Sequence, residues 1–206
     1  MTTLSNIKNI IFDLGGVILN IDPKKTLDEL YKIGVPKVDN LKALIGPCSP
    51  PTLYEIGAIS SDEFREWIKE QAGRNISDEL VDKAWTAMLL DVPVHRVEFL
   101  RRLSKEYRLF LFSNTNEIHQ RHYEQKFKQH YHFQIADLFE KVYYSHIIGL
   151  RKPEPEGFLH IMNENALHAN ETLFVDDMEV NVLAAESLGM KGFHLKANMD
   201  ISEMKG

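Results

Sequence analysis

The sequence predicts an α/β fold in which a Rossmann-like core with a parallel sheet carries an inserted all-helical cap. Three observations lead to this prediction. Short segments rich in β-branched and aromatic residues recur along the chain, and amphipathic helical patterns separate the later ones. The stretch between the first of these segments and residue 91 shows helical patterns and no convincing strand. The chain has 206 residues, 44% of them hydrophobic and 26% charged, which is enough for an ordinary globular core.

Five segments are predicted to be buried strands, because each is short and mostly apolar: residues 9–14, 108–113, 141–145, 172–176 and 192–195. Apolar residues at helical spacing predict helices between the later strands, at residues 94–107, 157–165 and 180–188. Gly189 is a natural stop for the last of these helices. Strands that alternate with helices in this way form a parallel sheet through right-handed crossovers.

The segment between residues 18 and 91 is predicted to be the cap. Residues 26–33 carry an apolar stripe, Ser60 and Glu63 have the spacing of a capping box, and Ser77 precedes another amphipathic pattern. Helical patterns that interrupt the alternation after the first strand indicate an insertion. We therefore divide the chain into a cap of residues 18–91 and a core formed by residues 1–17 and 92–206.

Charge and cysteine content limit the partners that we expect. A formal net charge of -6 disfavours nucleic acid, whose phosphates need clustered Lys and Arg. No apolar run reaches the length of about eighteen residues that a membrane span needs, and no secretory leader is evident. Cys48 is the single cysteine and lies in a turn-like stretch, so neither an internal disulfide nor a catalytic thiol is expected. The sequence predicts a cytoplasmic protein and leaves its oligomeric state open.

Polar residues lie at the ends of the predicted strands, where parallel sheets bind ligands. Each of them could instead cap a turn or face solvent. Together they are chemically complementary, because carboxylates suit a hard divalent cation and a carboxylate can also attack phosphorus. Hydroxyl, amide and ammonium groups can hold phosphoryl oxygens. The residues of this candidate site are Asp13, Gly15, Ser113, Asn114, Lys152, Asp176 and Asp177.

Four motifs contain these residues and occur in a fixed order: FDLGGV, LFSNTN, LRKPEP and FVDDMEVN. In this order and spacing the sequence resembles the haloacid dehalogenase-like hydrolase superfamily, over nearly the whole chain. It is most similar to the helical-cap branch that holds sugar-phosphate phosphatases, such as α-glucose-1-phosphate phosphatase, and the N-terminal domain of soluble epoxide hydrolase. Residues 54–60 of the cap also resemble the turn and helix that this branch carries.

The resemblance implies a site for magnesium. Asp13 would be both the nucleophile and a ligand of the ion, and the carbonyl of Gly15 would be a further ligand. Asp177 aligns with the metal-binding Asp of the fourth motif, and Asp176 would support the ion directly or through water. Asn181 stands where a second acidic residue often stands in the family.

The resemblance also implies how the substrate is held. Ser113 and the amide of Asn114 would hold the phosphoryl group, and Lys152 would pair with that group and with Asp13. The implied reaction is hydrolysis of a small phosphorylated metabolite, with sugar phosphates among the candidates, through an aspartyl-phosphate at Asp13.

One departure from the family pattern concerns the proton that the leaving group needs. Most phosphatases of the family have Asp two residues after the nucleophile, where this sequence has Gly15. General acid–base catalysis typically contributes about 10²–10⁴ in rate, so we expect slower turnover and a preference for good leaving groups.

Two alternative functions stay open. A haloacid dehalogenase would also use Asp13 as nucleophile, although it has no need of the acidic pair. The other alternative is a catalytically weak protein that binds a phosphorylated ligand, and Gly15 is the only residue that supports it.

Four histidines lie close together in the sequence, at positions 119, 122, 130 and 132. His119 and His122 have the spacing of one helix face, which a transition-metal site would also use. Because Gln, Arg, Glu and Lys residues surround them, we expect a polar, exposed helix instead.

Overall fold

The computed structural model describes residues 6–39, 46 and 48–204, and the parts of the predicted core, cap and Cys48 turn at 1–5, 40–45, 47 and 205–206 lie outside them. Five parallel strands form one sheet in the order β3-β2-β1-β4-β5. The predicted α/β fold with a parallel sheet is confirmed, and each strand begins and ends within two residues of its predicted bounds. The strands are β1 Asn9–Phe12, β2 Arg108–Ser113, β3 Lys141–Tyr144, β4 Thr172–Asp176 and β5 Lys191–His194.

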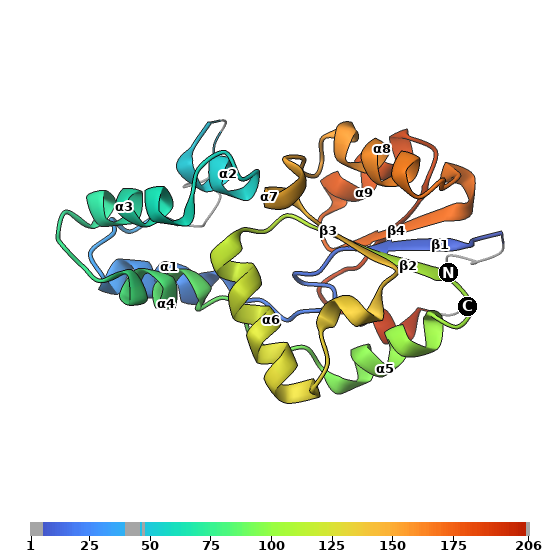
Figure 1. Ribbon diagram of the computed structural model, residues 1–206, viewed down its shortest axis with the longest axis horizontal. Helices are drawn as coiled ribbons and strands as arrows, with labels where there is room; N and C mark the ends of the chain where they lie inside the picture. The colour runs from blue at the N-terminus through green and yellow to red at the C-terminus, as the bar shows by residue number, and fades with distance from the viewer. Residues whose placement is uncertain (1–5, 40–45, 47, 205–206) are drawn as a thin grey trace.

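Helices cover both faces of the sheet (Figure 1). Successive side chains of β1 point to opposite faces, so Ile10 and Phe12 belong to one buried cluster and Ile11 to another. The first cluster is covered by α5 Val94–Leu103 and α6 Glu117–Tyr131, and the second by α8 Pro155–Glu164 and α9 Glu179–Ser187. Shorter helices are α7 Ser145–Ile148, η2 Ile135–Leu138, η3 Ala169–Glu171 and η4 Ile201–Glu203.

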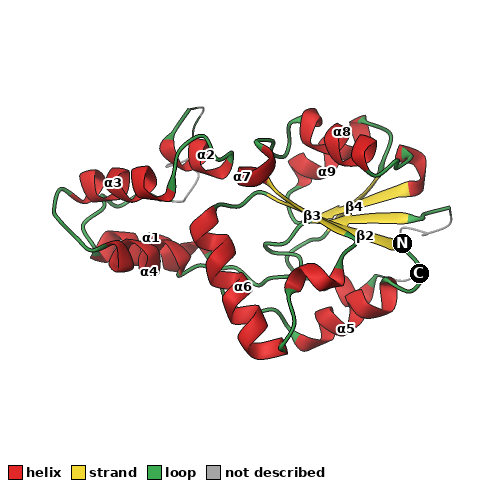
Figure 2. Cartoon of the chain, viewed as in Figure 1, coloured by secondary structure: helices red, strands yellow, loops and turns green. Residues whose placement is uncertain are grey.

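Four helices form a unit at the carboxyl end of the sheet, on the left in Figure 2. They are α1 Pro23–Lys32, α2 Pro50–Glu55, α3 Ser61–Ala72 and α4 Asp78–Thr86. The predicted capping box is present, because the Ser60 hydroxyl accepts from the Glu63 amide and the Glu63 carboxylate accepts from the Ser60 amide. Ser77 caps α4. The boundaries of the predicted cap at residues 18 and 91 stay a prediction.

The two chain segments that join this helical unit to the core run side by side. The Asn20 amide donates to the Asp91 carbonyl at 2.8 Å, and the Leu90 amide donates to the Asn20 carbonyl at 3.0 Å. Ile21 and Leu89 form an antiparallel bridge in the same place. The chain therefore enters and leaves the helical unit at one point. Any further contact between the unit and the core is made elsewhere on the unit.

A second connection between the helical unit and the core is a chain of buried hydrogen bonds at the start of α6. The Tyr54 hydroxyl accepts from the Ile118 amide at 3.0 Å and lies 2.7 Å from the Ser61 hydroxyl, which in turn donates to Glu117. The first amides of a helix have no partner within the helix, so Tyr54 satisfies one of them. The position of the unit is thereby tied to the segment that directly follows β2.

We predict that Tyr54→Phe destabilises the protein by about 1–3 kcal/mol, because the ring still fills its buried space but the Ile118 amide loses its acceptor. Urea unfolding measures this change. Tyr31→Phe is the matched control, since Tyr31 is 59% exposed. Equal unfolding midpoints for the two variants would contradict the role given to the Tyr54 hydroxyl.

The expectation of an exposed helix at the histidines is wrong for His119, which is 8% exposed. Its Nε2 lies 3.0 Å from the Trp85 carbonyl oxygen, and its ring stacks on Trp85 at 5.2 Å. Burial lowers the pKa of His119 to about 4, although the carbonyl of Trp85 opposes the shift. The face of α6 that carries His119 packs against α4. The polar residues that surround His119 in the sequence gave no indication of this contact.

Within the described residues, no helix has the length and apolar character needed to cross a membrane.

Candidate active site

Strand register brings the carboxylates of two motifs together. Phe12 pairs with Leu111 of β2 and with Val175 of β4, so the next residue of each strand lies at the same edge. The Asp13 amide donates to the Val175 carbonyl at 2.9 Å, which continues the β1–β4 pairing by one step. Asp13 therefore stands beside Asp176 at the carboxyl end of the sheet.

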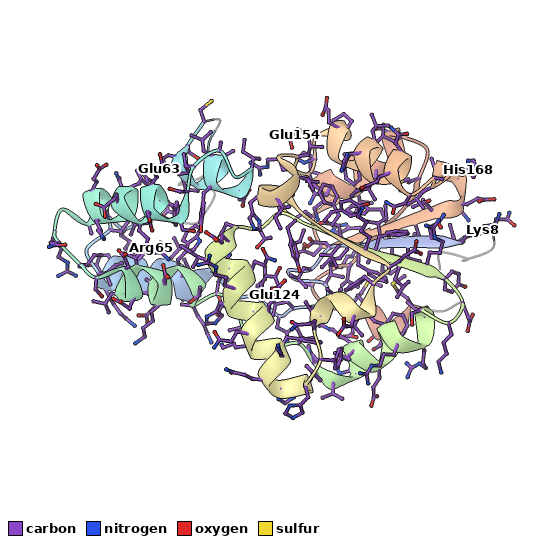
Figure 3. The ribbon with its side chains drawn as sticks, in the orientation of Figure 1. Lys8, Glu63, Arg65, Glu124, Glu154 and His168 are labelled. Atoms are coloured by element: carbon purple, nitrogen blue, oxygen red, sulfur yellow. The ribbon has the colours of Figure 1, made fainter. Side chains whose placement is uncertain are left out.

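Lys152 links these two carboxylates. Its Nζ donates to Asp13 Oδ1 at 2.6 Å and to Asp176 Oδ2 at 2.7 Å, and the residue is 1% exposed. The aromatic rings of Phe112 and Phe174 flank the ammonium, with centroids 5.5 and 5.4 Å away. A buried cation with two carboxylate partners and two aromatic faces is held in one position. Glu154, labelled in Figure 3, lies two residues further along the same loop.

Asn114 holds the backbone of this lysine. Its amide group donates to the Lys152 carbonyl at 2.8 Å, and its Oδ1 accepts from the Lys152 amide at 2.9 Å. Ser145 fixes the neighbouring turn in a similar way, because its hydroxyl accepts from the Thr115 amide and donates to the Thr115 carbonyl. The segments that follow β2 and β3 are thus joined by side chains, and Ser113 lies buried at the end of β2.

Asp176 and Asp177 have different surroundings. Asp176 is fully buried, and besides Lys152 its oxygens accept from the Met178 amide at 2.8 Å and from the Asn181 amide group at 3.1 Å. Asp177 is partly exposed, and its carbonyl lies 3.1 Å from the Nε2 atom of His194. Asp13, Asp176 and Asp177 can each offer one oxygen, and these atoms lie within 4.8 Å of one another.

Burial and the neighbouring charges shift the pKa values of the site residues. Burial raises the pKa of Asp13 to about 7; Lys152 opposes this rise, and Asp176 and Asp177 add to it. Burial also raises the pKa of Asp177, with a contribution from Asp176. Burial alone would lower the pKa of Lys152, but Asp13 and Asp176 raise it. Three carboxylates against one ammonium leave an excess of negative charge, which favours a bound cation.

Two adjacent glycines after the first strand have different constraints. Gly16 has φ = 75°, and a Cβ there would lie 2.4 Å from Asp177 Oδ2, so only glycine lets the two motifs approach. Gly15 lies outside the left-handed region, and a Cβ there would make an ordinary contact of 3.5 Å with Ile21. Gly16 was not among the predicted site residues, although the Gly-Gly pair that begins two residues after Asp13 is a signal for a close backbone approach.

The predicted site residues lie at the carboxyl ends of β1, β2 and β4 and in the loop before α8, and these segments meet at one edge of the sheet: Asp13, Gly15, Ser113, Asn114, Lys152, Asp176 and Asp177. The side chains of three of them are in direct contact, namely Asp13, Lys152 and Asp176. The side chain of Asn114 has a further role that the sequence did not predict, because it positions Lys152.

Comparison with known proteins gives consistent matches. The model of the haloacid dehalogenase-like hydrolase family matches residues 7–189. The chain is 30% identical to a D-ribitol-5-phosphate phosphatase of Bacteroides thetaiotaomicron over 199 residues, which is 94% of each chain. It is also 30% identical to a sesquiterpene phosphatase of Aspergillus oryzae over 189 residues, 91% of this chain and 89% of that one. A HAD family enzyme of Bacteroides thetaiotaomicron, in complex with magnesium and inorganic phosphate, superposes with a TM-score of 0.84 at 34% identity, covering 95% and 98% of the two chains.

Proposed function

Since the chain belongs to the haloacid dehalogenase-like hydrolases, we propose that it hydrolyses small phosphomonoesters, a sugar phosphate among them, with magnesium as cofactor. The observation that carries the proposal is the buried Lys152 ammonium between Asp13 and Asp176. A fixed positive charge beside a carboxylate at a sheet edge suits attack on a phosphoryl group. The phosphatase names of two relatives support this choice.

The proposed reaction has two displacements at phosphorus. An oxygen of Asp13 attacks the phosphorus atom, the bond to the alcohol oxygen breaks, and that oxygen takes up a proton. Water then attacks the aspartyl-phosphate, inorganic phosphate leaves, and the carboxylate of Asp13 is restored. Lys152 offsets the charge of the phosphoryl group, while the Ser113 hydroxyl and the Asn114 amide hold its oxygens.

The residues at the site fit a hard divalent cation. Carboxylate and carbonyl oxygens are the ligands that Mg²⁺ takes, and the three nearby carboxylates supply them. Because the oxygens of Asp176 already accept protein hydrogen bonds, we propose Asp13, Asp177 and the Gly15 carbonyl as ligands and Asp176 as their support. When bound, the ion would neutralise part of the charge on the phosphoryl oxygens.

We predict that Asp177→Ala raises the magnesium concentration for half-maximal activity by more than about 100-fold, and Asn181→Ala by about 10–100-fold. The reason is that the first variant removes a ligand, whereas the second removes one hydrogen-bond donor to Asp176. Titration of phosphate release against magnesium measures both. If Asn181→Ala has the larger effect, the proposed division between ligand and support is wrong.

The proposed function is tested by phosphate release from p-nitrophenyl phosphate, with magnesium and with a chelator. We expect activity that requires the metal. Halide release from a 2-haloacid that is unaffected by chelator would instead favour the dehalogenase alternative. Tight binding of phosphate without turnover would favour the ligand-binding alternative, to which Gly15 alone points. A small phosphorylated metabolite as partner, no nucleic-acid or membrane partner, and a cytoplasmic location all stay predictions.

A further inference from the structure

A cavity of about 370 Å³ lies where the helical unit joins the core. One of its walls is α6, which extends from the helical unit along the core toward α5 (Figure 1). The other wall is the segment of residues 89–94, through which the chain returns from α4 to α5. None of the predicted site residues lines this cavity, so it is separate from the candidate active site.

Most of the lining is apolar and buried. Leu19, Leu89, Tyr123 and Phe127 are each 7% exposed or less. Tyr123 and Phe127 are four residues apart, so their rings lie on one face of α6. Small-molecule sites are usually cavities of about 300–1,000 Å³ with mainly apolar and aromatic walls and a few polar groups. The size and the lining of this cavity agree with that description, and its two rings suit an aromatic ligand.

Three side chains give the cavity its charge: Lys126 and His130 of α6, and Asp91 of the opposite wall. Lys126 and His130 are one helical turn apart and therefore lie on the same face. The Asp91 carboxylate already accepts from the Asn20 side-chain amide at 3.2 Å. Lys126 is exposed, and it forms no ion pair within the part of the chain that the structure describes. Two basic groups, one of them an unpaired ammonium, favour a ligand that carries a carboxylate.

The cavity also borders the loop that follows the nucleophile. The Leu19 carbonyl accepts from the Gly16 amide at 2.8 Å, and Gly16 packs so closely on Asp177 that a Cβ would lie 2.4 Å from its carboxylate. Leu90, in the opposite wall, donates its amide to the Asn20 carbonyl at 3.0 Å. A ligand that touches Leu19 and Leu90 is therefore in contact with both connections between the helical unit and the core.

We propose that this cavity is a second ligand site, which binds a small aromatic carboxylate, and that its occupant slows turnover. The aromatic group lies against Tyr123 and Phe127, and the carboxylate pairs with Lys126. A ligand that binds this arrangement stabilises it, so the two connections are held together. Turnover slows because many enzymes are limited by the movement of a lid or by product release. The kinetic part of this inference rests on the proposed phosphatase function, whereas the binding part does not.

The binding part is tested by NMR titration with 2-naphthylacetate, with magnesium and excess inorganic phosphate present to occupy the catalytic site. We expect amide shifts in residues 89–94 and in α6, and a Kd of about 1 mM or lower. Lys126→Gln should weaken binding by about two- to fivefold, the range of an exposed ion pair, without changing the affinity for the neutral 2-(2-naphthyl)ethanol. Lys128→Gln is the matched control, because Lys128 is exposed on α6 and does not line the cavity.

The kinetic part is tested by p-nitrophenyl phosphate hydrolysis at saturating 2-naphthylacetate. We expect kcat to fall by about fivefold, the lower end of typical coupling between two sites, with KM changed by no more than about twofold. A rise in KM at unchanged kcat would place the carboxylate in the catalytic site, and the proposal would be wrong.

Three further results would overturn the proposal: no binding, equal affinities of the wild type and Lys126→Gln, or binding that leaves the kinetics unchanged. A wild-type protein that binds 2-naphthylacetate with the expected shifts but hydrolyses no phosphate ester would instead overturn the proposed function. The second ligand site itself would then be confirmed.

Discussion

Asp13→Asn is expected to abolish phosphate release, with a loss of about 10⁴-fold or more, the order typical when a covalent nucleophile is removed. The amide has the shape of the carboxylate but is a poor nucleophile. The fold should persist, because Lys152 keeps its bond to Asp176 and the Asp13 backbone amide keeps its bond to β4. Rates with p-nitrophenyl phosphate and magnesium, together with the urea unfolding midpoint, measure both expectations.

A matched variant separates this effect from a general loss of charge. Asp28→Asn removes one exposed carboxylate from α1, and it should leave the rate unchanged. If Asp13→Asn folds like the wild type and retains its turnover, Asp13 is not the nucleophile, and the mechanism proposed above fails.

Gly15→Asp is expected to raise the hydrolysis of alkyl phosphates by up to about 10²–10⁴, the usual contribution of general acid–base catalysis. Glycine offers no proton to the leaving oxygen, and alkyl alcohols need that proton more than phenols do. The backbone accepts the change, because Gly15 lies outside the left-handed region and a Cβ meets Ile21 at 3.5 Å. The gain on aryl phosphates should be smaller.

Gly15→Asn is the control for this substitution, since it adds a side chain of the same shape without a titrating group. The gain should appear in the Asp variant alone. The native enzyme should meanwhile prefer aryl and anomeric phosphates over simple alkyl phosphates. Equal rates of the native enzyme on alkyl and aryl esters would show that another group already supplies the proton.

Much of the core could be predicted because its signals are local. A short apolar run that ends in Asp13 or Asp176 is a buried strand with a polar end, and such strands meet at one edge. The capping box at Ser60 and Glu63 is local in the same sense, and it fixes the start of α3. These patterns were sufficient for the sheet and for most of the helices, and they predicted that the polar strand ends would meet at one edge.

The features that the sequence analysis missed depend on contacts between distant segments. The α2 helix, which begins with two prolines, was not among the predicted helices. His119 is buried because its face of α6 meets α4, and the hydrophilic residues around it in sequence gave no sign of this. The bonds from Asn114 to Lys152 and the need for glycine at position 16 arise from loops that meet only in the folded chain.

The most direct test of the account is to look for the aspartyl-phosphate itself. The protein is mixed with magnesium and a radiolabelled phosphate ester, quenched rapidly in acid, digested, and the labelled peptide is sequenced. We predict label on Asp13, absent from the Asp13→Asn variant. Hydrolysis of the ester by the wild-type protein with no labelled peptide, or with label on another residue, would contradict the central claim that Asp13 is the nucleophile.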